Sequence, residues 1–282
     1  MKIVDSFMFN NEYDILEIRL SELYDHVDRF VIVESDHSFT NIPKPYNFEN
    51  NASRYERFFD KIHYVKCKLP CYAEPWDNER WTRDQKAEGW YDLTSEDILL
   101  DTDGDEIPRP EFVQFIKSDA ATHKCYGMVM PFFYFKLNYL NTYQPYHYVA
   151  WGKAFKGYDK YKTGSMLKYE GFGNDYQFIH HSGWHFSCIG DHEFNIQKLK
   201  NNCHTELPID KLVEELDIEK CIAEGNDHLG RNNYNWKPIK IDNFFPKTVL
   251  DNQEKYKQHI LETNDSLKSG FDYYPFNICQ VV

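Results

Sequence analysis

The sequence predicts an α/β protein with a mostly parallel sheet that carries helices on both faces. Two observations lead to this expectation. Through the first hundred residues, apolar runs typical of strands alternate with segments whose apolar residues recur at helical spacing. In such a βαβαβαβ order, crossover connections bring successive strands together in parallel. The chain also has 282 residues, of which 41% are hydrophobic, so it can bury a core without cross-links.

The amino-terminal part contains four strand-like runs with three helix-like segments between them. The second run, "RFVIVES", has a continuously apolar centre, which is typical of a buried parallel strand. In the first helical segment Leu16, Leu20 and Leu23 recur at helical spacing, and Asn11 is placed to cap it. The strands are expected at residues 2–9, 29–35, 62–67 and 97–102, and the helices at 11–27, 51–62 and 77–91.

After Pro110 the pattern changes. Two aromatic runs are expected to pair as an antiparallel ribbon, and two further helices follow them. From Trp236 onward the chain is rich in Pro, Asn and Tyr, and this tail is expected to wrap around the surface. No internal repeat or low-complexity linker interrupts the chain, so we expect a single domain. The aromatic runs cover residues 125–140 and 146–155, and the helices are expected at 191–202 and 208–225.

The composition excludes several classes of function. A net charge of −13 and a pI near 5.4 are poorly suited to binding nucleic acid or an anionic membrane surface. Seven scattered cysteines without a CxxC pair indicate free thiols in a reducing compartment. No signal-peptide pattern opens the sequence, and no apolar run reaches the ~20 residues of a membrane span. A cytoplasmic chain without a membrane span is therefore expected.

Residues 98–110, "ILLDTDGDEIPRP", place acidic residues directly after an apolar run. Asp101, Asp103 and Asp105 alternate as the ligands of a calcium loop would. An EF-hand needs glycine at its sixth position and glutamate at its twelfth, but Glu106 and Phe112 stand there. A solvated acidic turn remains a plain alternative. A buried strand that ends in carboxylates would instead place them at the carboxyl edge of the sheet, where open α/β folds bind ligands.

Five sequence blocks occur in an order that resembles glycosyltransferase family 17. They are the first forty residues, then "DGDEIPRP", "SGWHFS", "HTE" and "GNDHLGR", and the resemblance covers roughly residues 1–235. It implies a GT-A fold, a UDP-sugar donor, a divalent ion (Mn²⁺ or Mg²⁺), a carbohydrate acceptor and inversion at the anomeric carbon. The family usually has a bulky apolar residue between the two acids, so Gly104 is expected to make this loop more flexible.

The resemblance implies a metal site at Asp103 and Asp105. A divalent ion held by this pair would act as a Lewis acid on the departing diphosphate. His185 in "GWHFS" is the candidate for a further ligand, and its alternative role is that of a hydrogen-bonded core histidine. His204 in "HTE" is the rival ligand. Glu106 is expected to support a ligand through a hydrogen bond, and its alternative role is that of a helix or turn cap.

The nucleotide is expected at the ends of the first two strands. Asn11 and Glu12 follow the first strand and Glu34 ends the second, positions that border the nucleotide in a sheet of this kind. The alternative for Glu34 is a capping carboxylate. Arg83 and Arg231 are candidates to pair with the diphosphate, because guanidinium matches phosphate geometry. For both arginines a surface ion pair is an equal alternative.

An inverting transfer needs a carboxylate that takes the proton of the acceptor hydroxyl. Glu206 is the first candidate and Asp227 the second, since both lie in blocks shared with the family. The chain then divides into a nucleotide-binding half (1–110), a half that completes the acceptor and metal sites (111–235) and the tail (236–282).

Three functions stay open from the sequence. The leading hypothesis is a metal-dependent transferase that moves N-acetylglucosamine or another hexose. A nucleotidyltransferase also uses an acidic metal pair, but the glycine-rich nucleotide loop that would favour it is missing. A calcium-stabilised carbohydrate-binding protein would suit the 17% aromatic content but not the βα alternation.

Overall fold

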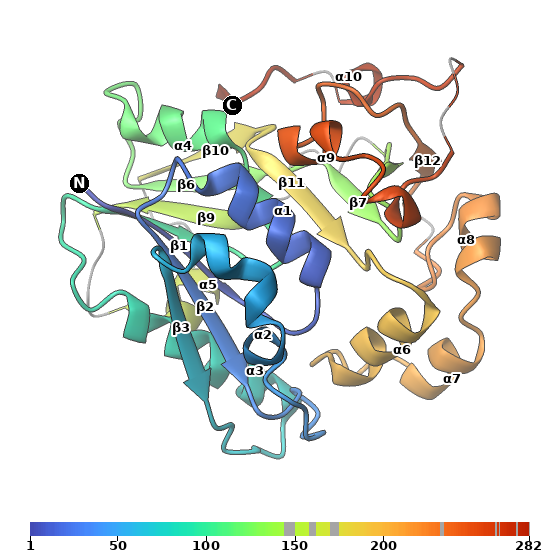
Figure 1. Cartoon of the computed structure of the whole chain (residues 1–282), viewed down its shortest axis with the longest axis horizontal. Helices are drawn as coiled ribbons and strands as arrows, with labels where there is room; N and C mark the ends of the chain where they lie inside the picture. Colours follow the sequence, from blue (N-terminus) through green and yellow to red (C-terminus); the bar gives the residue numbers. More distant parts are fainter. Residues whose placement is uncertain are drawn as a thin grey trace.

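A main sheet of eight strands forms the centre of the molecule (Figure 1). The strand order is β13-β10-β6-β9-β4-β1-β2-β3, and β4, β1, β2 and β3 are parallel to one another. The strands are β1 (Ile3–Met8), β2 (Arg29–Ser35), β3 (Ile62–Cys67), β4 (Ile98–Asp101), β6 (Cys125–Val129), β9 (Ala150–Lys156), β10 (Tyr176–His180) and β13 (Gln280–Val281). The computed structural model describes residues 1–143, 150–157, 162–169, 175–231, 234–262, 264, 266–274 and 276–281.

The first four strands confirm the prediction from the alternating pattern. Residues 29–35 and 62–67 form strands with the expected bounds, and the other two begin and end one residue inside them. The predicted antiparallel pairing also occurs, between β6 and β9. Residues 146–149 of the second aromatic run lie outside the described residues. The α/β class with a mostly parallel sheet is confirmed.

Helices cover both faces of this sheet. On one face Leu16 and Leu20 pack with Phe7 and Phe30, and on the other Trp90 and Leu167 pack with Val31. The first face carries α1 (Tyr13–Leu23), α2 (Asn47–Asn50), η1 (Ala52–Phe58) and α4 (Pro110–Lys117). The second carries α3 (Pro75–Asp84), η2 (Gln85–Gly89) and α5 (Gly164–Tyr169).

The first helix is not capped by Asn11, and this expectation is wrong. Its N-cap is Glu12, and no side chain accepts a hydrogen bond from its first turn. Glu12 turns back instead, and its carboxylate accepts hydrogen bonds from the backbone N–H groups of Asn10 (3.3 Å) and Asn11 (3.1 Å). The side chain of Asn11 donates to Gln197 in a distant helix at 3.3 Å. Asn11, which the local pattern predicted to be a cap, therefore makes a tertiary contact with Gln197 instead.

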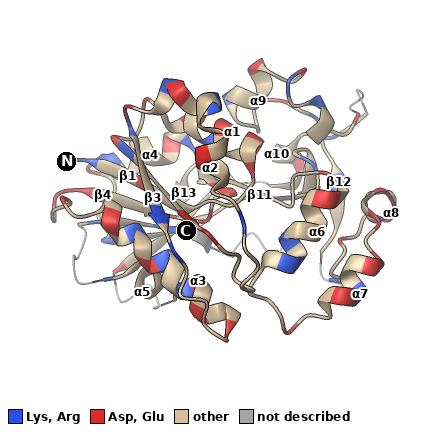
Figure 2. Cartoon of the chain, turned by 60° about the horizontal axis from the view of Figure 1, so that its bottom comes forward, with Lys and Arg blue, Asp and Glu red and all other residues tan. Residues whose placement is uncertain are grey.

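The helical segment expected at 208–225 consists of two short helices, α7 (Ile209–Glu214) and α8 (Ile218–Glu224). The break occurs where the Asp217 carboxylate accepts the N–H of Lys220 at 2.9 Å and caps α8. Neither helix contains a buried residue, and both carry charged positions along their length (Figure 2). The preceding helix, α6 (His192–Asn201), agrees with the predicted one.

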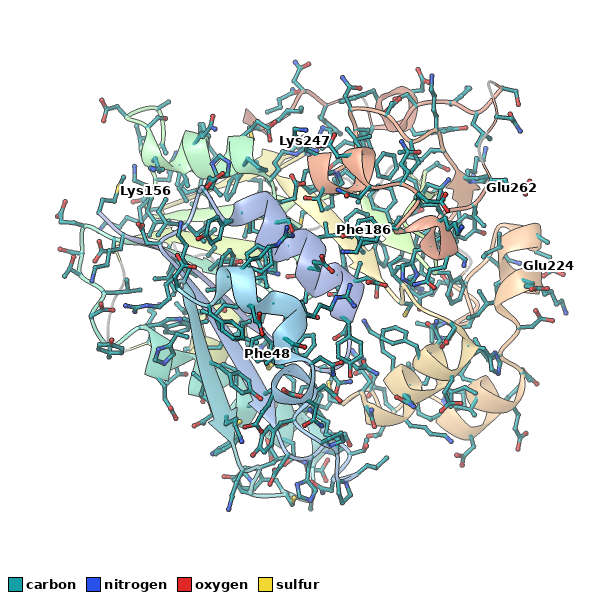
Figure 3. All side chains as sticks on the ribbon, in the orientation of Figure 1. Phe48, Lys156, Phe186, Glu224, Lys247 and Glu262 are labelled. Atoms are coloured by element: carbon teal, nitrogen blue, oxygen red, sulfur yellow. The ribbon has the colours of Figure 1, made fainter. Side chains whose placement is uncertain are left out.

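A second sheet of five strands packs beside α1 (Figure 1). Phe186 on its strand β11 lies between α1 and the tail helices (Figure 3), in a core to which the tail contributes the buried Phe244, Tyr256 and Tyr274. The tail therefore supplies part of a core besides covering the surface. The strands are β12 (Trp236–Pro238), β8 (Tyr139–Asn141), β7 (Phe132–Tyr134), β11 (Gly183–Ser187) and β5 (Glu106–Pro108), and the tail elements are α9 (Lys247–Asp251), η4 (Lys257–His259) and α10 (Gly270–Tyr273).

Candidate active site

A cleft of about 560 Å³ opens at the carboxyl ends of β1, β2 and β4. Asp103, Gly104 and Asp105, which follow β4, form part of its wall. Lys168 of α5, His185 of β11 and residues of α3 and α6 also line it. The cleft therefore lies where the carboxyl edge of the main sheet meets the second half of the chain, as expected for an open α/β fold.

A buried arginine holds the acidic loop. Arg19 of α1 is inaccessible to solvent, and its guanidinium donates to both carboxylate oxygens of Asp5, at 2.8 and 2.5 Å. The same guanidinium donates into the segment after β4. Its acceptors there are the Thr102 hydroxyl and the carbonyls of Asp103 (2.8 Å), Gly104 (3.3 Å) and Glu106 (2.9 Å). Helix α1 thereby fixes the backbone of the two acids relative to β1.

Gly104 allows this loop to pack closely on β1. A Cβ atom at position 104 would lie 2.7 Å from the carbonyl oxygen of Met8, which is closer than side chains come to backbone atoms. The glycine therefore serves a tight backbone contact. The expectation that it makes the loop flexible is replaced by this role.

Two cations hold Asp103. Its Oδ1 lies 2.8 Å from Nη2 of Arg83, and its Oδ2 lies 3.0 Å from Nζ of Lys168. Although removal from water would raise it, the pKa of Asp103 lies well below its usual value because Arg83 and Lys168 favour the charged form. Glu106 accepts the backbone N–H of Asp103 at 2.8 Å, and burial raises the pKa of Glu106 to about 7. The carboxylate of Asp103 is thus held on both sides by positive charge.

Asp105 contacts a lysine and a histidine. Its Oδ2 lies 2.9 Å from Nζ of Lys198, and its Oδ1 lies 3.7 Å from Nε2 of His185. Burial lowers the pKa of His185 to about 4, against the opposing effect of the Asp105 carboxylate, so the imidazole is neutral at pH 7. Its ring stacks on Phe132, with 4.5 Å between ring centroids. His185 is thus oriented by a core aromatic and stays in the form that can bind a metal.

The donor set of this site fits a divalent ion. Asp103, Asp105 and His185 offer two carboxylates and a neutral imidazole at one end of the cleft, a combination that suits Mn²⁺. Among the described residues, no three His, Cys, Asp or Glu side chains already stand in the arrangement of a metal centre. Lys168 and Lys198 neutralise the two acids instead. An ion could bind here only if these ammonium groups moved away from the carboxylates.

The structure brings seven of the sequence-derived candidates together, and Glu106 and His204 are two of them. Glu12 and Arg83 line the same cleft as Asp103, Asp105 and His185. Oε1 of Glu12 lies 3.5 Å from Nζ of Lys198, the lysine that contacts Asp105. The nucleotide candidates from the first strand and the third helix are therefore adjacent to the acid pair.

Glu34, Asp227 and Arg231 lie away from the lining of the cleft, and Asn11 and Glu206 are not part of that lining either. Glu34 is buried beneath it and accepts the backbone N–H groups of Asn47 (2.6 Å) and Phe48 (3.0 Å), so it caps α2. Asp227 is buried and forms an ion pair with Arg231, 2.9 Å from Oδ2 to Nε. Among the described residues, the lining of the cleft does not include Glu34, Asp227 or Arg231. Their contacts fit the capping and ion-pair alternatives.

The histidine and glutamate of "HTE" form a pair at the rim. His204 lines the cleft and packs edge-on against Trp76, with 4.7 Å between ring centroids. Its Nδ1 lies 2.6 Å from Oε1 of Glu206, which is exposed. The hydrogen bond with His204 lowers the pKa of Glu206, so this residue is a carboxylate at neutral pH. Glu206 is therefore connected to the cleft by its hydrogen bond with His204.

The sequence reasoning missed Lys168, Lys198 and Arg19. Lys198 lies on the helix between "SGWHFS" and "HTE". The feature that could have pointed to it is its position between two family blocks of an acidic chain. Lys168 is in a region without a recognisable pattern. Arg19 lies on the apolar side of an amphipathic helix, where a charged residue signals a buried ion pair.

The described helices include none with both the length and the apolar character needed to cross a membrane. All seven cysteines lie within the described residues, and all are free thiols. The predicted cytoplasmic location stays a prediction.

Residues 1–261 match the profile of glycosyltransferase family 17. The β-1,4-mannosyl-glycoprotein 4-β-N-acetylglucosaminyltransferases of Rattus norvegicus and Homo sapiens are each 27% identical to this chain over 127 residues, or 41% of it. These stretches make up 23% and 24% of the two proteins, so the chain spans about a quarter of the length of these curated relatives.

Among solved structures, the mannosyltransferase PcManGT from Pyrobaculum calidifontis, in complex with GDP-Man and Mn²⁺, is 12% identical with a TM-score of 0.42. The match covers 77% of this chain and 65% of that one. The family profile, by contrast, extends from the first strand through the cleft and into the tail, and on this match the chain belongs to glycosyltransferase family 17.

Proposed function

We propose that this chain transfers a sugar from a UDP-sugar to a hydroxyl group of a carbohydrate acceptor, with inversion and with Mn²⁺ or Mg²⁺. The observation that carries the proposal is the acid pair at the end of β4, which lies in a cleft among three cations from three different elements. The names of the matched relatives favour N-acetylglucosamine as the sugar. The fold that corresponds to this proposed function is the GT-A fold.

The charges of the cleft suit a diphosphate. A divalent ion at Asp103 and Asp105 would stabilise the negative charge of the leaving group. Arg83, Lys168 and Lys198 could then pair with phosphate oxygens, because the ion would replace them at the carboxylates. A guanidinium and two ammonium groups in a partly closed cleft stabilise such charge more than they would in water.

The nucleoside fits the part of the cleft formed by the ends of β1 and β2. Phe9, Ser35 and His37 line this part, and Trp76 of α3 also lines the cleft. An aromatic ring and short polar groups can hold a base and its ribose. This placement leaves the α6 side of the cleft for the acceptor.

Glu206 stays the candidate base. It is charged at neutral pH and bonded to His204, which lines the cleft. The pair could accept the hydroxyl proton at the imidazole or at the carboxylate. Asp227 is less suitable, because Arg231 and Trp236 already donate to its buried carboxylate, at 2.9 and 3.2 Å.

Titration of the protein with UDP tests the proposal. We expect measurable UDP affinity with Mn²⁺ and a loss of at least about tenfold with a chelator, because without the ion the cations of the cleft stay paired with Asp103 and Asp105. A screen of UDP-sugars for hydrolysis with Mn²⁺ would then identify the donor. Equal affinity in Mn²⁺ and in chelator would contradict metal dependence, and no affinity for UDP in either would favour a carbohydrate-binding protein.

A further inference from the structure

A second pocket of about 340 Å³ adjoins the cleft. The two hollows share Asn10, Lys44 and Asn201 as walls. The second pocket lies between the loop after β1, the segment before α2 and helix α6. Five of its lining residues carry carboxamide groups, and they are Asn10, Asn11, Asn47, Gln197 and Asn201. Its volume is within the range of small-molecule sites, about 300–1,000 Å³.

The lining of this pocket has almost no net charge. Lys44 is its only described ionic residue, and Nζ of Lys44 lies 2.9 Å from the buried carboxylate of Glu34. The adjoining cleft, in contrast, is lined by several acids and bases. A charged ligand would thus bind in the cleft, and the second pocket suits a neutral one.

Four of the carboxamides and one backbone carbonyl are joined by hydrogen bonds. Asn47 donates to the carbonyl of Asn10 (2.8 Å), Asn10 donates to Oδ1 of Asn11 (3.2 Å), and Asn11 donates to Oε1 of Gln197 (3.3 Å). These bonds connect the loop after β1 with α6 and orient the amide groups. The pocket is therefore partly built before any ligand arrives.

Asn201 differs from the other amides. Its side chain is half-buried at the border of the two hollows, and its carboxamide makes no hydrogen bond to any described residue. A carboxamide has two N–H donors and an oxygen with two lone pairs. One such group is thus available to a ligand that extends from the cleft into the second pocket.

We propose that the second pocket is a subsite for a neutral sugar ring of the acceptor, next to the ring whose hydroxyl is glycosylated. The inference rests on the proposed glycosyl transfer. Sugar hydroxyls both donate and accept hydrogen bonds, as carboxamides do, and the ring of Tyr13 offers an apolar face. Lys198, which contacts Asp105, precedes Asn201 by three residues on α6, so one helix borders both the reacting centre and the subsite.

The test uses Gln197→Met, because Gln197 lines only the second pocket and methionine keeps its length. Asn201→Leu is the second variant. The matched controls are Gln253→Met and Asn243→Leu, at exposed positions of the tail outside both described linings. The probes are methyl β-mannoside and N,N′-diacetylchitobiose, each followed by saturation-transfer NMR with and without UDP and Mn²⁺, and UDP affinity is measured by calorimetry.

We expect at least one probe to bind the wild-type protein and both pocket variants to weaken it by about fivefold or more, the effect of losing one hydrogen bond. The UDP affinity of Gln197→Met, which lines only the second pocket, should stay within about twofold, and the controls should behave as wild type. If neither probe binds, or if the variants bind it as well as wild type does, the subsite is refuted. Weakened UDP binding with unchanged probe binding would assign the pocket to the nucleotide and also refute it.

The failure of the proposed function would look different. If UDP does not bind to the wild-type protein but a probe does, and the pocket variants lose that probe, the pocket is a sugar site and glycosyl transfer from UDP-sugars is wrong.

Discussion

The Nζ atom of Lys198 lies 2.9 Å from Oδ2 of Asp105 and holds a carboxylate that is proposed to bind a metal. Although burial would lower it, the pKa of Lys198 is raised because Asp105 and Glu12 favour its charged form. A divalent ion must displace this ammonium group, whereas a diphosphate would give the ammonium a new anionic partner. Metal and nucleotide are therefore expected to raise each other's affinity.

Replacement of Lys198 tests this competition. Lys198→Met should bind Mn²⁺ more tightly than wild type in the absence of nucleotide, by about tenfold, because one charged hydrogen bond no longer has to be broken. The same variant should lose UDP affinity and turnover. Mn²⁺ titration followed by electron paramagnetic resonance measures the first effect. Lys200→Met, two residues further along α6 and exposed, is the control. Weaker Mn²⁺ binding in Lys198→Met would show that the lysine does not compete with the ion.

Asp105→Asn separates a catalytic ion from a structural one. We expect the melting temperature of the nucleotide-free protein to stay within about 3 °C of wild type, because Glu12 still lies 3.5 Å from the Lys198 ammonium. Turnover with UDP-sugar and Mn²⁺ should fall by roughly a hundredfold or more. Thermal melting and a transfer assay measure the two effects. A large loss of melting temperature with turnover retained would indicate a structural calcium loop.

Glu206→Gln tests the candidate base. Donor affinity should change little, and transfer should fall by roughly a hundredfold or more, because the hydroxyl proton loses its acceptor. Since Glu206 is exposed, the melting temperature should not change. Asp210→Asn, an exposed acid at the start of α7, is the control. Unchanged turnover would assign the role of base to another residue.

Arg19→Lys tests the anchor beneath the acidic loop. A lysine ammonium cannot reproduce the planar set of donors that satisfies the Asp5 carboxylate and the loop carbonyls at once. We expect a loss of about 2–4 kcal/mol in the free energy of unfolding, measured by urea denaturation. Arg57→Lys, whose side chain is 62% exposed, should change it by less than about 0.5 kcal/mol. Equal effects of the two substitutions would argue against the anchor.

The contact between the tail and α1 should be sensitive to acid. Asp14 of α1 contacts His259 (2.7 Å) and Arg54. Although burial would raise it, the pKa of Asp14 is lowered because both partners favour the carboxylate. A depressed carboxyl pKa stabilises the fold above the unfolded value, about 3.9, and this stabilisation is lost as the pH falls further. Asp14→Asn should therefore lower the free energy of unfolding at pH 7. The difference in this free energy between the variant and wild type should shrink below pH 4. A constant difference from pH 7 to pH 3 would contradict the ion contact.

The strands of the first half could be predicted because local signals decide them. The apolar centres of residues 29–35 and 62–67 and the acids after β4 are visible without tertiary information. The second sheet could not be predicted in the same way. Its strand β5 has three residues and pairs with β11 more than seventy positions later. Both strands lie in recognised sequence blocks, but nothing in "DGDEIPRP" or "SGWHFS" predicts that the two pair.

The candidate site was predictable for the acids and for Glu12, Arg83 and His185, but not for its two lysines. Asp103 and Asp105 follow a recognisable strand, whereas their lysine partners lie 65 and 93 residues further along the chain. Nothing in the sequence near Lys168 or Lys198 indicates which acid each contacts. Glu34 shows the opposite case, since its position at a strand end suited a ligand contact, but the backbone of α2 occupies its carboxylate.

The orientation of α6 about its own axis limits where residues can be inserted or deleted during evolution. One inserted residue turns the rest of a helix by about 100°, so an insertion just before Gln197 would displace Lys198 from Asp105 and Asn201 from its pocket together. Helices α7 and α8 bury no residue and can absorb such a change. Insertions and deletions among homologous chains should therefore gather at residues 207–225 and avoid residues 192–201.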